Sequence, residues 1–170
     1  MARVFLISTA TMKKNSVVNN NVDDMYLLPS IEIAQDAGLQ PLIGTKLYNK
    51  LMDLVEDSSI TGATEYKYLL DEYIAPYLIN KATADIIIPL SYKMRNQGVV
   101  QQTSEYTYSP SLKDTQYVIQ NYENKANFYG NRLSDYLKAN RSKFPEYCSI
   151  DSCADMPSDS GSYKTGIYLG

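Results

Sequence analysis

The sequence predicts an all-α protein, a helical bundle with a long C-terminal helix, a β-like arm or hairpin between the last two helices, and an extended C-terminal tail. Apolar residues recur at helical spacing through most of the chain, and the longest such run, Ser111 to Asn140, contains one glycine and no proline. The preceding segment VVQQTSEYTYS, Val99–Ser109, alternates β-branched and tyrosine residues as strands do. We therefore divide the chain into a helical domain, 1–147, with the arm at 99–109, and a tail, 148–170.

The N-terminal part predicts one short segment and one helix. Residues 1–8 are apolar and indicate a strand or an arm, after which Thr9 or Thr11 begins a short turn. Asp23 and Asp24 then favour a helix start, because acidic groups stabilise the positive end of the helix dipole. We expect Gly38 to end this helix. Its expected inward residues are Leu27, Leu28, Ile31, Ala34 and Ala37.

Two further helices follow a connection bracketed by Pro41 and Gly44. Thr45 is predicted to cap the second helix, and Thr64 to cap the third. The third runs to about Arg95 and contains Pro76 and Pro89, which predict one bent helix or two stacked segments. The run Ile86-Ile87-Ile88 is apolar on all sides, so we expect that segment to be buried on several sides.

The long helix carries a seven-residue repeat. Its first register is Leu112, Ile119, Ala126 and Leu133, and its second is Thr115, Tyr122, Tyr129 and Tyr136. Packing of this seam against the third helix is one interpretation. The other adds contact with a neighbouring subunit through Tyr122, Tyr129 and Tyr136. Phe144 and Pro145 are expected to close the fold.

The charge and hydropathy of the chain argue against nucleic-acid binding and against a membrane-spanning protein. The net charge is −3, whereas nucleic-acid-binding proteins usually show a basic footprint. No apolar run approaches the roughly 18 residues that a membrane span needs, and the N-terminus does not have the pattern of a signal peptide. One local cationic cluster is interpreted as complementing the end of a helix dipole. It consists of Arg132, Lys138, Arg141 and Lys143, against Asp135.

Groups for catalysis are scarce. The chain has no histidine, the commonest general base, and no glycine-rich phosphate-binding motif. The pairs Glu32/Asp36 and Asp71/Glu72 are interpreted as solvated helix faces. We therefore expect no catalytic residue, no cofactor and no metal site. Cys148 and Cys153 are expected to be reduced thiols, with a disulfide between them as the alternative.

The tyrosine content favours surfaces that meet a partner. Sixteen tyrosines accompany three phenylalanines and no tryptophan, and tyrosine suits interfaces that are partly wet. Within the arm we select Val99, Val100, Tyr106 and Tyr108 as candidate interface residues. The polar tail ends in three apolar residues that we expect to dock on another chain, with folding back on the same subunit as the alternative. These are Ile167, Tyr168 and Leu169.

One stretch also resembles a known family. SIEIAQDAGLQPLIGTKLYNKL, Ser30–Leu51, with its Ala34-Gln35 pair, its Pro41–Gly44 turn and Leu47-Tyr48, resembles head–tail connector proteins of tailed bacteriophages, particularly the crAss-like and related Bacteroides phage type. The segment YLLDEYIAPYL, the turn at 96–99, the long tyrosine helix and KFPEY follow in the same order. The resemblance covers most of the chain up to Tyr147.

The resemblance implies a structural virion protein in the neck, assembled in the host cytoplasm. Its subunits would form a ring, usually a dodecamer, that binds the portal protein and the next neck or tail protein and acts in genome ejection. DNA would pass through the lumen without sequence-specific binding, and no membrane would be involved. The alternatives are a DNA-packaging ring protein similar to a terminase small subunit, and a non-viral helical adaptor.

Overall fold

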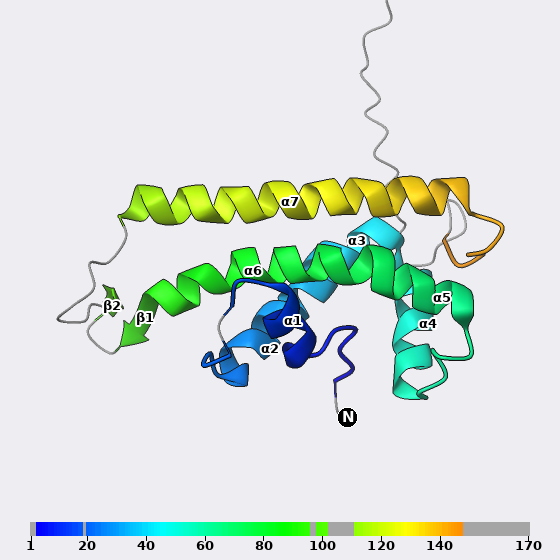
Figure 1. Cartoon of the computed structure of the whole chain (residues 1–170), viewed down its shortest axis with the longest axis horizontal. Coiled ribbons are helices and arrows are strands. Elements are labelled where there is room, and N and C mark those ends of the chain that lie inside the picture. Colours follow the sequence, from blue (N-terminus) through cyan, green and yellow to red (C-terminus); the bar gives the residue numbers. More distant parts are fainter. Residues whose placement is uncertain (1–2, 19, 96–97, 102–110, 148–170) are drawn as a thin grey trace, which may run out of the picture.

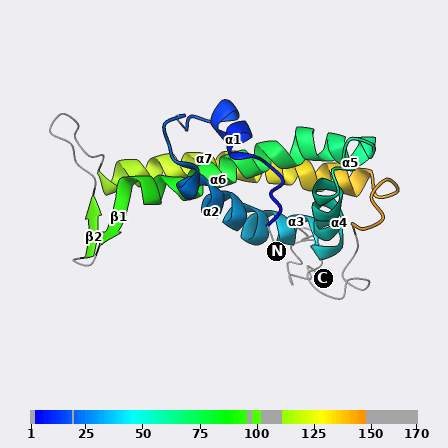
Figure 2. The ribbon, with the colours of Figure 1, turned by 90° about the horizontal axis from the view of Figure 1, so that it is seen from below.

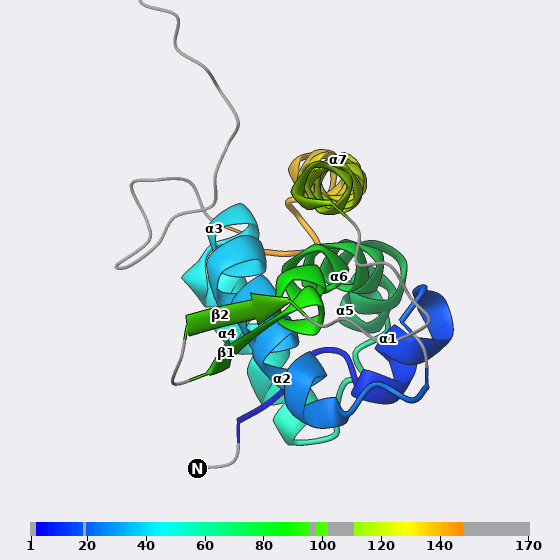
Figure 3. The same ribbon diagram turned by 90° about the vertical axis from the view of Figure 1, so that its left-hand side faces the viewer.

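The computed structural model describes residues 3–18, 20–95, 98–101 and 111–147. Over these residues the chain is mostly helical, as predicted. The helices form layers: α7 lies on one side of the continuous helix made by α5, η2 and α6, and α1 and α2 lie on the other side (Figure 1, Figure 3). The predicted tail, 148–170, lies outside the described residues.

The first layer is formed by α1 (Thr9–Asn15) and a longer helical run that passes without a break from α2 (Asp24–Ile33) through the π-helical turn η1 (Ala34–Leu39) into α3 (Gln40–Ile43). The prediction that Gly38 ends this helix is therefore wrong. The run ends at Gly44, whose φ of 80° and ψ of 154° lie in a region that favours glycine.

Helix α4 (Thr45–Glu56) follows directly, so Gly44 rather than Thr45 occupies the cap position. The third predicted helix is α5 (Thr64–Leu69), η2 (Leu70–Ile74) and α6 (Ala75–Ser91), which again join without a break. Ala63, not Thr64, precedes its first turn. The interpretation as a single helix is thus confirmed, and the division into two segments at Pro76 or Pro89 is wrong. The expected end near Arg95 is also wrong, because the helix ends at Ser91 and Tyr92–Arg95 form a strand.

The two π-helical turns explain how two of the prolines, Pro41 and Pro76, fit inside these helices. In each case the residue before proline donates its backbone N–H five residues back, from Gln40 to Gln35 and from Ala75 to Leu70. Proline in a regular helix collides with the carbonyl four residues earlier and removes a hydrogen bond. A wider turn moves that carbonyl away, so Pro41 and Pro76 follow without breaking the helix.

Helix α7 (Leu112–Ala139) has 28 residues and begins with a capping box between Ser111 and Asp114. It packs along α6, and the predicted seam is buried at Thr115, Ala126 and Leu133. Leu112 belongs to the same register but is 61% exposed. The seam therefore holds over most of α7 and fails at its first turn.

Ile88 corrects another expectation. Ile86 is buried but Ile88 is exposed, so the run is not covered on several sides. The physical reason is visible in Figure 1, where the last turns of α6 extend beyond α1 and α2. Beyond them lies a two-stranded antiparallel sheet, β1 (Tyr92–Arg95) and β2 (Gly98–Gln101), with Tyr92 opposite Gln101 and Arg95 opposite Gly98 (Figure 2). The predicted arm, 99–109, overlaps it only at 99–101, and 102–109 lie outside the described residues.

The N-terminal segment 3–8 forms no strand within its described length, but it is fixed to η1. The buried Gln35 side chain accepts a hydrogen bond from the Leu6 N–H at 2.7 Å and donates one to the Val4 carbonyl at 3.4 Å. Ser8, rather than Thr9 or Thr11, caps α1 by accepting from the Thr11 N–H.

At the end of the molecule away from the β1–β2 sheet, Phe144 closes the core and is fully buried, as expected. Its ring makes an edge contact with Tyr66 at 5.4 Å and a tilted contact with Tyr136 at 6.1 Å. Among the described helices, none combines the length and hydropathy needed to cross a membrane.

Candidate functional site

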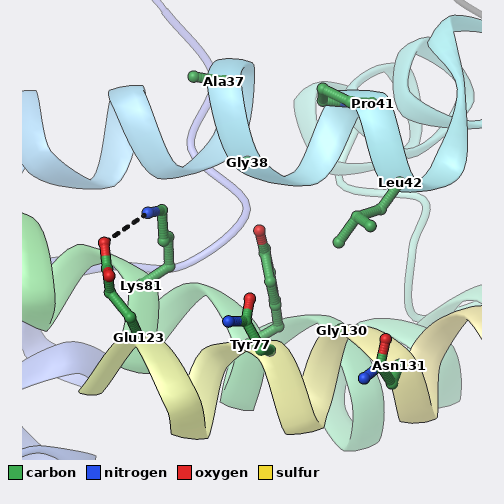
Figure 4. A pocket seen from close by; sticks show the side chains of 10 residues that line it. Ala37, Gly38, Pro41, Leu42, Tyr77, Lys81, Glu123, Gly130 and Asn131 are labelled. Atoms are coloured by element: carbon green, nitrogen blue, oxygen red, sulfur yellow. Dashed lines mark ion pairs between the residues drawn. The ribbon is translucent and has the colours of Figure 1, made fainter. Parts of the chain in front are cut away.

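A polar cleft of about 310 Å³ lies where η1 and α3 face α6 and α7 (Figure 4). Tyr77 of α6 lies at its centre, between Gly38 of η1 and Gly130 of α7. The other lining residues are Ala37, Pro41, Leu42, Lys81, Glu123, Asn127 and Asn131. Three helices thus meet around one tyrosine side chain.

The two glycines make room for that side chain. A Cβ atom at Gly38 would lie 2.7 Å from the Tyr77 hydroxyl, and one at Gly130 would lie 3.2 Å from the Tyr77 ring and 3.3 Å from Leu42. Neither glycine has a backbone conformation that excludes other residues, so close approach is what requires glycine here. Gly38 is a packing residue and not the helix end that the sequence predicted.

Tyr77 is buried, and its hydroxyl has no hydrogen-bond partner among the described residues. Burial raises the pKa of Tyr77 to about 12, and the nearby Asp85 carboxylate adds to the increase. The hydroxyl therefore stays protonated at neutral pH. It can donate a hydrogen bond to a group that enters the cleft.

Charged groups at the cleft connect α6 to α7. The Lys81 Nζ lies 3.9 Å from the Asp85 Oδ1 and 3.7 Å from the Glu123 Oε1 (Figure 4 shows the latter pair). The Asp85 Oδ2 is buried with no hydrogen-bond partner among the residues that the structure describes. Burial raises the Asp85 pKa, with Lys81 opposing and Glu123 reinforcing the increase. Within the described part of the chain, no group of three candidate metal ligands comes together.

A cluster of aromatic rings joins α5 and η2 to α7. Tyr73 and Tyr136 stack with their centroids 4.2 Å apart, and the Arg132 guanidinium lies over the Tyr73 ring at 4.6 Å. Tyr66 donates a hydrogen bond to the Glu146 carboxylate at 2.8 Å, and burial together with this carboxylate raises the Tyr66 pKa to about 12. Part of the tyrosine content therefore serves packing inside one subunit.

The predicted seam tyrosines have different surroundings. Tyr129 and Tyr136 are partly buried against the core of their own chain, in agreement with packing on the third helix. Tyr122 is half-buried, and the Lys125 Nζ lies over its ring at 4.6 Å. The contact with a neighbouring subunit through these three residues stays a prediction.

Exposed aromatic side chains instead lie on the side of α7 that faces away from α6. Tyr117 is 75% exposed and Phe128 is 65% exposed. They are eleven residues apart, which is close to three helical turns, so they share one face. We name Tyr117, Asn121, Asn124 and Phe128, all exposed, the α7 outer face.

Helix α2 is apolar on its exposed side as well as on its buried side. Met25 is 68% exposed and Ile33 is 55% exposed, and Leu28 and Pro29 beside them are also exposed. The expectation that Leu28 and Ala37 point inward is therefore wrong, because Leu27, Ile31 and Ala34 already fill the side that packs on α6. We name Met25, Leu28, Pro29 and Ile33 the α2 outer face.

The two outer faces lie on opposite sides of the molecule. Helix α6 runs between α2 and α7 in two perpendicular views (Figure 1, Figure 3). Each outer face points away from α6, since the buried residues of each helix point toward it.

The remaining predicted interface residues are only partly described. Val99 and Val100 lie in β2, opposite Met94 and Lys93. Tyr106, Tyr108, Ile167, Tyr168 and Leu169 lie outside the described residues.

Sequence reasoning missed both outer faces. The sequence signal for the α2 outer face was a helix with almost no polar side. The signal for the α7 outer face was two aromatic residues outside the heptad registers.

Comparisons with known proteins give a family and no activity. No curated protein and no solved structure matches the chain significantly. One family model matches residues 39–156, which is more than half of the chain and includes η2, α6 and α7. The protein therefore belongs to that family, which is described as a family of unknown function, DUF6712.

Proposed function

We propose that this protein is a structural subunit of the head–tail connector of a tailed bacteriophage, in a ring beneath the portal. The ring joins the capsid to the tail and continues the DNA channel. The observation that supports this best is that two outer faces on opposite sides of one subunit expose large side chains, aliphatic on α2 and aromatic on α7. The resemblance of Ser30–Leu51 to connector proteins supplies the identity of the assembly.

The energetic argument concerns what these side chains gain from a partner. Burying a large apolar side chain contributes about 1.5–3 kcal/mol before ordering costs. Contiguous exposed apolar residues on a soluble protein usually mark a contact surface. Met25, Ile33, Tyr117 and Phe128 are all more than half exposed, so an assembled form has much to gain.

The proposed partners are further copies of the chain, in a ring expected to be dodecameric, together with the portal protein and the next neck or tail protein. The net charge of −3 suits a lumen through which DNA moves without being held. Among the described residues the sheet consists of β1 and β2, so each strand has one edge that can pair with a strand of another chain.

The deciding experiment measures the mass of the full chain alone and with the portal protein from the same genome. We expect a ring-sized complex, at least when the portal protein is present. A chain that stays monomeric and does not bind the portal protein contradicts the proposal. Salt-sensitive binding to DNA would favour the packaging-protein alternative instead.

The arm and the tail have separate tests. Deletion of 99–108 is expected to leave a folded subunit that no longer enters particles. Truncation after Tyr163 removes Ile167, Tyr168 and Leu169, and is expected to weaken assembly while the stability of the monomer is unchanged. Loss of monomer stability with normal assembly would show that the tail packs on its own subunit.

A further inference from the structure

We infer that neighbouring copies of this chain meet head to tail, with the α7 outer face of one copy on the α2 outer face of the next. The inference rests on the proposed function only in requiring that several copies assemble. It specifies which two surfaces form the contact.

The first argument is the placement of the two faces. A contact with two-fold symmetry pairs a surface with the same surface of the partner, so it would cover only one of these faces. A head-to-tail contact joins two different surfaces and leaves one of each free for the next copy. Faces on opposite sides of α6 meet this requirement, and repetition of such a contact closes a ring when the rotation per copy allows it.

The second argument is size and chemistry. Tyr117 and Phe128 span about 16 Å of helix, and Met25 to Ile33 span about 12 Å. Two aromatic rings on one face meet flexible and branched aliphatic side chains on the other, which pack well around rings. The Asn121 and Asn124 amides between the rings, with Asn15 and Asn80 along the adjoining groove, can form the polar rim.

The third argument is charge. Residues 9–45 contain four acidic residues and two lysines, and Arg3 pairs with two of the acids, so this layer has a net charge of −1. Helix α7 contains four cationic and three acidic residues, a net charge of +1. Glu123 faces Lys81 and Arg132 lies over Tyr73 of the same chain, so setting both aside leaves the charge of the outer part of α7 at +1. The two surfaces therefore attract each other, whereas two copies of either one repel.

Cysteine cross-linking tests the contact directly. The background variant carries Cys148→Ser and Cys153→Ser in the full chain, and Leu28→Cys and Phe128→Cys are added singly or together. A short bismaleimide reagent should link the two single variants to each other when they are mixed, and should link neither to itself. The double variant should give a ladder of multimers. Lys67→Cys, on the exposed surface of α5, is the matched control and should give no ladder with either partner.

Blocked variants give an independent readout by native mass. Tyr117→Asp/Phe128→Asp removes the α7 outer face, and Met25→Asp/Ile33→Asp removes the α2 outer face. Each variant alone should be monomeric, and a mixture should stop at a dimer of one copy each, since one intact surface of each kind remains. All four positions are exposed, so the circular dichroism of each variant should match that of the parent chain.

Three outcomes overturn the inference. They are cross-linking of Phe128→Cys to itself, self-association of the variant with a blocked α2 outer face, and absence of any link between the mixed single variants. The first two can occur in a chain that still forms portal-bound rings, and would therefore leave the proposed function intact. Failure of the unmodified chain to assemble on the portal protein contradicts the proposed function separately.

Discussion

Tyr77 limits how closely η1 and α7 can approach α6. Its ring lies beside Gly130 of α7 and its hydroxyl beside Gly38 of η1, so each of these helices presents a glycine where it contacts Tyr77. The hydroxyl has no hydrogen-bond partner within the described residues, which means that contact distance rather than a hydrogen bond determines this packing. Substitutions can therefore separate the volume of the side chain from its polarity.

Gly38→Ala should lower the free energy of unfolding by about 1 kcal/mol. Overpacking against Tyr77 costs about 1–3 kcal/mol, and the better helix propensity of alanine offsets about 1 kcal/mol of that. Urea denaturation measures the change. In a Tyr77→Phe background the same substitution should be neutral or stabilising, because the atom 2.7 Å from the new Cβ is gone. Gly62→Ala, whose Cβ would meet nothing closer than 3.6 Å, is the control. Equal effects at both glycines would refute this account.

The raised pKa of Tyr77 predicts a loss of stability in alkali. The pKa is about 12 in the folded chain, against an ordinary value of 10.0, so the unfolded chain releases its proton first as pH rises. The free energy of unfolding should therefore fall between pH values of about 10 and about 12, with Tyr77 contributing on the order of 2–3 kcal/mol. Tyr77→Phe should make this fall shallower in urea titrations at several pH values. An unchanged slope would show that Tyr77 ionises as easily in the folded chain as in the unfolded one.

Asp85 predicts a pH effect of the same sign in a more acidic range. Burial raises its pKa, so the folded chain favours the protonated carboxyl and is less stable when the group is charged. Asp85→Asn should therefore raise the melting temperature at neutral pH, and the gain should shrink as pH falls below the folded pKa. A destabilised Asp85→Asn variant at neutral pH would mean that the 3.9 Å contact with Lys81 outweighs desolvation.

At the scale of the elements, sequence periodicity predicted the helices but not how they continue. The spacing of Leu27, Ile31 and Ala34 located the buried side of α2 correctly. Local sequence rules predicted that Gly38 ends a helix and that Pro76 bends or divides one, yet both lie inside continuous helical runs. A wide turn beside proline and a glycine that faces a tyrosine both depend on neighbours distant in sequence, which local spacing does not contain.

The seam of α7 has an informative contrast within one register. Leu133 and Leu112 occupy equivalent heptad positions, but Leu133 is fully buried and Leu112 is mostly exposed. Leu133→Ala should cost about 2–5 kcal/mol, because it leaves a cavity between α6 and α7. Leu112→Ala should change the free energy of unfolding by less than about 0.5 kcal/mol. Similar losses at both positions, measured by urea denaturation, would show that the core extends to the first turn of α7.

For the candidate site, the sequence indicated contact surfaces in general but not their location. The high tyrosine content favoured surfaces that meet a partner, yet Tyr73 and Tyr136 stack within one subunit. Tyr117 and Phe128 fall outside the registers, so the heptad analysis gave them no role. Exposure is a property of the whole fold, and only the placement of α6 between α2 and α7 shows that two apolar faces remain uncovered.

At the scale of the whole molecule, the N-terminal layer is joined to the part that matches the family. The family match begins at residue 39, inside η1, but α2 buries Leu27 and Ile31 against α6. Segment 3–8 is held by the buried Leu6 and Ile7 side chains, by ion pairs of Arg3 with α2 and η1, and by two hydrogen bonds with the Gln35 side chain. The Gln35 amide therefore supplies the backbone hydrogen bonds of this segment, while apolar packing and the Arg3 ion pairs also attach it.

Gln35→Leu should make segment 3–8 open more often without unfolding the rest. The substitution leaves the buried Leu6 N–H and the Val4 carbonyl without partners, at a cost of about 1–3 kcal/mol each while the segment stays in place. Detachment of the segment lets water satisfy both groups, so hydrogen exchange at the Leu6 amide should accelerate by about 10–100-fold. Amides of α6 and α7 should keep their protection. Gln40→Leu, which loses only a contact with the Thr45 hydroxyl at 3.0 Å, should leave Leu6 exchange unchanged. If Gln35→Leu instead accelerates exchange equally in all helices, segment 3–8 unfolds together with the core and is not separately attached.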